Sequence, residues 1–149
     1  MTKGSVKLNQ RRYQLWRIWD QEKPFILYIL LNPSYADEHN DDRTVVKLIN
    51  FTKKFGFGGF YLGNLQTFIT PYPRLLKDNT LAKEPTNLKH LKKMKEKCEK
   101  VVFGWGNAYD LPPWLKGMVD HPYCFGINQN GTPKHPLYIS YEKELIPYL

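Results

Sequence analysis

The residues best suited to chemistry in this sequence include two asparagines that follow apolar segments. Asn32 comes directly after the most apolar stretch of the chain, where a rigidly held carboxamide could orient a water or a ligand. Asn64 offers a donor and an acceptor together, the combination that reads a nucleobase edge through two hydrogen bonds. The alternatives are an Asx turn at Asn32 and a contact with loop backbone at Asn64. Because other polar segments accompany Asn32, we favour a ligand-binding role there.

His135 is the histidine with the strongest case for a functional role. It stands in the segment Asn130-Gly-Thr-Pro-Lys-His-Pro136, where an Asn-Gly turn and two prolines limit backbone freedom. Such a loop fixes where the imidazole and the neighbouring Lys134 can point. His135 is therefore a candidate hydrogen-bond donor to a carbonyl or phosphate oxygen. His39 and His90 lie in charged stretches that we expect at the surface.

Three aspartates, Asp37, Asp41 and Asp42, stand close together after Asn32. They are enough for a general base or for a hydrated Mg²⁺ site. For at least two of them, capping and solvation at the start of a helix is the better explanation. Trp105 stands between two glycines, and its indole is better explained by packing than by stacking on a ligand.

The hydrophobic pattern predicts an α/β domain that spans residues 1–149. Alternation over 11–19 predicts an N-terminal edge strand, and the apolar run 25–31 predicts a buried central strand that ends at Asn32-Pro33. Further strands are expected at 60–65, 101–105 and 122–127, helices at 43–55, 88–98 and 113–119, and a loop at 71–80. Strands that alternate with helices favour a three-layer α-β-α fold with a four-stranded, mostly parallel central sheet.

This topology predicts where the polar segments meet. Segments 32–42, 64–67, 106–107 and 128–135 each follow an expected central strand. The carboxyl ends of parallel strands share one edge of the sheet, and ligands bind in the crevice there. The sequence therefore predicts a single site that gathers these segments.

Charge and composition restrict the classes of partner. The net charge of +8 favours a polyanion, although basic residues can equally serve solubility. The aromatic content of 15% adds side chains that can stack on bases as well as fill a core. The lysine-rich face of the helix at 88–98 is most simply a solvated surface.

Several common classes find no support in the sequence. The longest apolar run is far shorter than the ~20 residues of a membrane span, and no secretory signal is visible, so we expect a cytoplasmic protein without a membrane partner. Cys98 and Cys124 form no CxxC or Cys/His cluster, which argues against a disulfide framework or a zinc site. P-loop, GxGxxG, HExxH and Gly-x-Ser-x-Gly motifs are missing.

Ordered motifs along nearly the whole chain resemble the family called domain of unknown function 1643, found in bacteria and their phages. They are Arg12-Tyr13 with Trp19-Asp20, Leu31-Asn-Pro-Ser-Tyr-Ala-Asp37, Asp41-Asp42 with Thr44, Gly56-Phe-Gly-Gly59, Asn64-Leu65, Trp105-Gly106 and Gly131-Thr-Pro-Lys-His-Pro-Leu-Tyr138. The family name carries no activity.

A more distant resemblance, to a second family, does imply an activity. Asn32-Pro33, Asn64, Trp105-Gly106 and His135-Pro136 are similar, in order, to motifs of the uracil-DNA glycosylase superfamily. The resemblance implies that Asn32 positions the attacking water, Asn64 reads a flipped base, and His135 stabilises negative charge on the base carbonyl. The substrate contacts that go with it are Pro33, Ser34, Tyr35, Asn64, Trp105, Lys134 and Pro136.

The resemblance has departures. The glycine that commonly precedes the first motif is replaced by Leu30-Leu31, and Leu137-Tyr138 stand where a Ser-Pro is common. Asn32 cannot act as a base, so Asp37 or a neighbour would have to activate the water.

The expected function is recognition of a nucleobase in nucleic acid or a nucleotide, with hydrolysis of its N-glycosidic bond and no metal or other cofactor. The alternatives are a non-catalytic nucleic-acid or nucleotide-binding module and a Mg²⁺-dependent small-molecule hydrolase or transferase. The base and the oligomeric state are left open.

Overall fold

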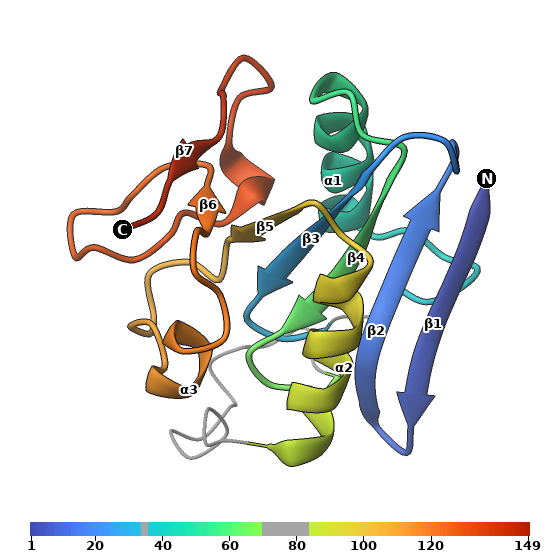
Figure 1. Cartoon of the computed structure of the whole chain (residues 1–149), viewed down its shortest axis with the longest axis horizontal. Helices are drawn as coiled ribbons and strands as arrows, with labels where there is room; N and C mark the ends of the chain where they lie inside the picture. Colours follow the sequence, from blue (N-terminus) through green and yellow to red (C-terminus); the bar gives the residue numbers. More distant parts are fainter. Residues whose placement is uncertain (34–35, 70–83) are drawn as a thin grey trace.

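The chain forms a mixed β-sheet with helices on both faces, as a computed structural model shows for residues 1–33, 36–69 and 84–149 (Figure 1). Within these residues the sheet has seven strands in the order β1-β2-β4-β3-β5-β6-β7. The strands are β1 (Thr2–Leu8), β2 (Arg11–Ile18), β3 (Phe25–Leu30), β4 (Gly59–Asn64), β5 (Lys100–Phe103), β6 (Tyr123–Cys124) and β7 (Ile146–Pro147). Strands β4, β3, β5 and β6 are mutually parallel, whereas β1, β2 and β7 pair antiparallel with their neighbours.

In the described ranges the helices that accompany the sheet are α1 (Arg43–Lys54), α2 (Pro85–Glu96), α3 (Pro113–Lys116) and the 3₁₀ turn η3 (Pro136–Tyr138). Successive residues of a strand point to opposite faces, and β3 shows how the core divides. Tyr28 packs in the cluster that contains α1 residues, whereas Leu27 and Ile29 pack with residues of α2 and α3. The buried sheet therefore has a hydrophobic core on each side. None of the helices in the described ranges is long and apolar enough to cross a membrane.

Local sequence signals explain where these elements start and stop. Asp42 caps α1 because its carboxylate accepts a hydrogen bond from the Val45 amide at 2.9 Å. Pro85 opens α2, where a missing N–H costs nothing. Gly56, at φ +83°, follows α1 in the left-handed region that glycine adopts without strain.

The expected α/β class is confirmed, but the expected sheet is wrong in its extent. A mixed seven-stranded sheet replaces four mostly parallel strands plus one edge strand. The segment predicted as the edge is the interior strand β2, which lies between β1 and β4. Strand β1 is mostly exposed and so shows little alternation of apolar residues, and β7 has only two residues.

Other boundaries also shift. The strand expected at 122–127 is reduced to β6, and the helix expected at 113–119 ends at Lys116. The loop expected at 71–80 lies outside the described residues.

Candidate functional site

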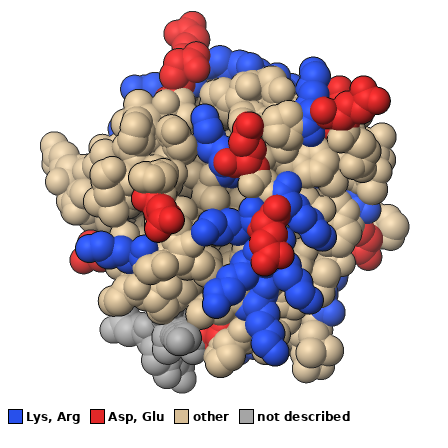
Figure 2. All heavy atoms as spheres, in the orientation of Figure 1, with Lys and Arg blue, Asp and Glu red and all other residues tan. Residues whose placement is uncertain are grey.

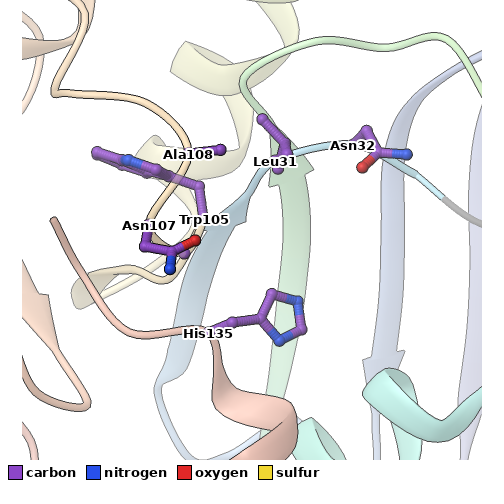
Figure 3. A pocket seen from close by; sticks show the side chains of 7 residues that line it. Leu31, Asn32, Trp105, Asn107, Ala108 and His135 are labelled. Atoms are coloured by element: carbon purple, nitrogen blue, oxygen red, sulfur yellow. The ribbon is translucent and has the colours of Figure 1, made fainter. Parts of the chain in front are cut away.

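A cavity of about 240 Å³ lies beyond the carboxyl ends of β3 and β5, and it is lined by Leu31, Asn32, Trp105, Gly106, Asn107, Ala108 and His135 (Figure 3). Pockets for drug-sized ligands usually measure roughly 300–1,000 Å³, so this cavity suits a single ring system. It brings together three predicted site residues that are far apart in the chain: Asn32, Trp105 and His135.

The hydrogen bonds of His135 define its protonation. This residue caps η3, and its Nδ1 accepts a hydrogen bond from the Leu137 amide at 3.1 Å. The proton of the neutral ring therefore sits on Nε2. Burial lowers the pKa of His135 to about 4, against the opposing pull of the Asp42 carboxylate. At neutral pH the ring is uncharged, and Figure 3 shows its second nitrogen turned to the side where Asn32 lies.

The Asn32 carboxamide is oriented by its own backbone segment. Its Nδ2 donates to the Pro33 carbonyl at 3.1 Å. Figure 3 shows the amide nitrogen turned away from His135 and the amide oxygen on the cavity side. The amide oxygen of Asn32 and Nε2 of His135 therefore both face the cavity.

Hydrogen bonds to backbone carbonyls hold the two loops around the cavity together. The Gly106 amide donates to the Pro133 carbonyl at 2.9 Å, and the Asn130 side chain donates to the Asn107 carbonyl at 3.0 Å. Gly106 has φ +88°, a conformation that L side chains rarely adopt. A glycine is therefore required where the chain turns from β5 into the cavity.

Trp105 forms part of the core as well as one wall of the cavity. Its side chain is buried, its Nε1 donates to the Tyr109 carbonyl at 2.8 Å, and its ring contacts Phe103 and Tyr148. A buried indole with its N–H satisfied supplies apolar surface rather than a hydrogen bond to a ligand.

Asn64 does not line this cavity, but its side chain is unusual. The residue is 2% exposed, and neither Nδ2 nor Oδ1 has a hydrogen-bond partner among the described residues. Its backbone carbonyl accepts a hydrogen bond from Asn87 Nδ2 at 2.9 Å. Each buried polar group without a partner costs ~1–3 kcal/mol, which is a reason to look for a ligand or a water there.

The other predicted contacts are dispersed. Pro33 and Pro136 are buried and do not line the cavity, and Lys134 lines a second cavity that adjoins the first. Ser34 and Tyr35 lie outside the described residues.

The aspartates stabilise a loop instead of lining the cavity. Hydrogen bonds from the His39 and Asn40 amides to Asp37 hold the pKa of this carboxyl below its ordinary value. Asp42 caps α1, and Asp41 accepts a hydrogen bond from Arg17 Nε at 2.8 Å. No group of three metal-ligating side chains occurs in the part of the chain that the structure describes.

Arg12 and Arg17 of β2, which the sequence prediction missed, hold this loop in place. Arg17 is fully buried and donates to Asp41 and to the backbone carbonyls of Trp16, Asp37 and Asn40. Arg12 donates to the Ala36 carbonyl at 2.6 Å, and burial lowers its pKa to about 10, opposed by the Asp42 charge.

A β-bulge explains how both arginines reach the same loop. They are an odd number of residues apart, so a regular strand would point them to opposite faces. The register between β1 and β2 shifts at this point, where Val6 pairs with Gln14 and Lys7 pairs with Arg12. Tyr13 and Gln14 consequently both contact His90, which is half-buried rather than at the surface as predicted. The available signal was that Arg12 and Arg17 stand beside apolar residues such as Tyr13, Trp16 and Ile18 in a segment predicted to be a strand.

These features define a small α/β protein with a polar cavity at the carboxyl ends of parallel strands. A family model described as protein of unknown function (DUF1643) matches residues 12–137, and the chain belongs to this family. No curated protein and no solved structure matches the chain. The likeness to the uracil-DNA glycosylase superfamily is not shown by these comparisons.

Proposed function

We propose that this chain is a glycosylase-like domain that binds a nucleobase in the cavity and hydrolyses its N-glycosidic bond. The main support is the pairing of a neutral His135, whose Nε2–H is its free donor position, with the Asn32 carboxamide in one cavity. A single planar ring fits the volume of about 240 Å³. The buried Trp105 supplies an apolar wall.

The chemistry follows from these two groups. When the bond between C1′ of the sugar and the base nitrogen breaks, its electron pair moves onto the base and negative charge grows on the base carbonyl. The Nε2–H of His135 would stabilise that oxygen as a hydrogen-bond donor. The Asn32 oxygen would accept a hydrogen bond from water and direct it at C1′. The water oxygen bonds to C1′, its proton goes to solvent, and the base takes up a proton to leave as the free base.

Asn64 fits this proposal as the residue that reads the base. A base edge with one donor and one acceptor would satisfy both of its unpartnered amide atoms. Asn64 pairs with Leu30 in the sheet, directly before the cavity residue Leu31. Because the Asn64 side chain is buried and lies outside the cavity lining, this contact requires a local rearrangement around Asn64 when the base binds.

One observation favours the alternative of a binding module. None of the residues that line the cavity is a carboxylate, and Asp37, the predicted base, serves the loop instead. General-base catalysis typically contributes 10²–10⁴-fold, so hydrolysis without it would be slow. A domain that recognises a base without cleaving it would keep the same cavity.

A base-release assay separates the two functions. The protein is incubated with single- and double-stranded oligonucleotides that carry uracil, mismatched or modified bases, and the released bases are identified by mass spectrometry. We expect release that falls about 100- to 1,000-fold in His135→Ala and about 100-fold in Asn32→Ala. The exposed His121→Ala serves as the matched control.

Each other outcome has a definite meaning. Oligonucleotide binding without release would support the binding module. Activity that a chelator abolishes would support the Mg²⁺-dependent hydrolase or transferase. A protein that neither binds the oligonucleotides nor releases a base from them would overturn the proposed function.

A further inference from the structure

A second cavity of about 400 Å³ adjoins the first and shares Gly106, Asn107 and His135 with it. Its remaining lining residues are Asn128, Lys134, Tyr138 and Ile139. The two cavities together are too large for one base, and the second has a different chemical character. It contains a cation and an exposed aromatic ring, which the first cavity lacks.

The cation is Lys134. Its stem lies across Gly126, where an added Cβ would stand 3.2 Å from Lys134 Cδ, so the side chain is laid down on the protein. Among the described residues no carboxylate pairs with its ammonium group. A half-buried lysine with no counter-charge at the wall of a cavity is well placed to contact a phosphate.

The aromatic ring is Tyr138. It is 82% exposed, and in the described part of the chain no other ring or cation packs on it. Its backbone is nonetheless fixed, because it ends η3, which packs against α1, and the next residue, Ile139, is buried. The nearby Tyr141 differs, because it contacts Phe51 and lies under the Lys47 ammonium. An exposed ring on a fixed backbone is a platform on which a base can stack.

The loop that carries these groups is held by its own hydrogen bonds. The Asn128 amide donates to the Thr132 carbonyl at 2.8 Å, the Lys134 amide donates to the Gly126 carbonyl at 2.9 Å, and Tyr148 Oη donates to the Gly131 carbonyl at 2.7 Å. A ligand that binds here meets a largely pre-formed surface, so little conformational entropy is lost on binding.

We infer that the second cavity is a subsite for the neighbouring nucleotide, so that the substrate is a nucleic-acid strand rather than a free base or nucleoside. Lys134 contacts the phosphate that links the two nucleotides, and the neighbouring base stacks on Tyr138. This inference rests on the proposed function, because it takes the first cavity as the place where a base binds.

The test measures how binding depends on the length of the ligand. Short single strands of about five nucleotides, a length within the usual site size, are labelled with fluorescein and titrated by fluorescence anisotropy. DNA and RNA versions of each base composition are used. Free bases, nucleosides and 5′-mononucleotides serve as competitors. We expect strands to bind at least about tenfold tighter than nucleosides, because a phosphate contact and one stacked base are added.

Variants locate the effect. Tyr138→Ala is expected to weaken strand binding about 5- to 100-fold, whereas Tyr138→Phe keeps the stacking face and the affinity. Lys134→Gln is expected to weaken strand binding and to reduce the slope of log affinity against log salt by about 0.7. Lys92→Gln removes the same charge from the exposed face of α2 and is the matched control. Thermal unfolding of each variant checks the fold, and the exposed Tyr138 can be replaced without disturbing the core.

The inference fails if nucleosides compete as well as strands, or if Lys92→Gln weakens binding as much as Lys134→Gln does. Its failure is distinct from that of the proposed function. Strand binding that depends on Tyr138, with no base released, keeps the subsite and overturns hydrolysis. Equal release from nucleosides and from strands keeps hydrolysis and overturns the subsite.

Discussion

His135 links the candidate site to pH, because its pKa of about 4 in the folded chain lies below its ordinary value of 6.5. The unfolded chain therefore binds more protons at this residue between these two values, and folding stability falls as pH drops through that window. Above about pH 6.5 the ring is neutral in both states and the effect vanishes. Acidification also gives Nδ1 a proton and so removes the acceptor of the Leu137 amide.

We predict that His135→Gln reduces the loss of stability on acidification. Between pH 7 and pH 4.5 the wild-type free energy of unfolding should fall on the order of 2–3 kcal/mol more than that of the variant. Urea denaturation of both proteins at the two pH values measures this difference. Equal losses in both proteins would show that the folded pKa of His135 is not depressed.

Two buried asparagines, Asn64 and Asn87, permit a matched test of the unpartnered amide. Asn64→Leu removes two groups that have no partner in the described chain, so the free energy of unfolding should stay the same or rise by ~1 kcal/mol. Asn87→Leu removes the donor to the Asn64 carbonyl together with one Oδ1 that has no partner in the described chain, and the loss of the hydrogen bond should lower the free energy of unfolding by ~1–3 kcal/mol. Urea denaturation compares the variants. Equal destabilisation by both would mean that the Asn64 side chain is already satisfied.

At the level of elements, β2 holds the loop that follows Asn32. Arg17 reaches four acceptors from a fully buried position, whereas Arg11 of the same strand is exposed, donates to Thr67 Oγ1 at 2.9 Å and pairs with Glu84 at 3.6 Å. A buried donor with several acceptors contributes much more to stability than a solvent-exposed ion pair.

We predict that Arg17→Met lowers the free energy of unfolding by ~2–4 kcal/mol, and that Arg11→Met, the matched control, lowers it by less than ~1 kcal/mol. In Arg17→Met the loop 36–42 loses its contacts with Arg17 and keeps only the Arg12 hydrogen bond to Ala36 from β2, so base binding should weaken as well. Chemical denaturation and the binding titration measure the two effects. An Arg17→Met protein as stable as Arg11→Met would show that the loop is held by other contacts.

At the level of the whole molecule, part of the net charge of +8 comes from a cluster of basic side chains. Figure 2 shows lysines and arginines gathered over the face that α2 covers, and the exposed lysines of this segment are Lys89, Lys92, Lys93 and Lys97. None of these lysines lines the first or the second cavity. Such a face attracts polyanions without orienting them.

We predict that the affinity for short strands falls with salt in the wild type and that replacing these four lysines by glutamine leaves the salt slope for those strands unchanged. The expected reason is that short strands contact only the cavities, while the α2 face is solvated. Anisotropy titrations over a range of salt concentrations measure both slopes. A slope that decreases in the quadruple variant would instead place the phosphates on α2.

The sequence by itself determined the parts of the fold with strong local signals. The apolar run of β3, its end at Pro33 and the Asp42 cap of α1 are local features, and the structure has them where they were predicted. Of the four polar segments predicted to share one site, 32–42, 106–107 and 128–135 each contribute a residue to the cavity, whereas 64–67 does not. Whether these residues bind or cleave a nucleobase stays a prediction.

The extent of the sheet, the bulge in β2 and the surroundings of the site residues were decided only by the tertiary structure. These features depend on contacts between residues far apart in the chain. The exposed β1 carries little hydrophobic periodicity, and the bulge at Tyr13 exists only in its pairing with β1. The neutral state of His135 and the unpartnered amide of Asn64 come from burial by neighbouring elements. Desolvation is a property of the packed molecule, and a linear sequence does not state which groups will lose their water.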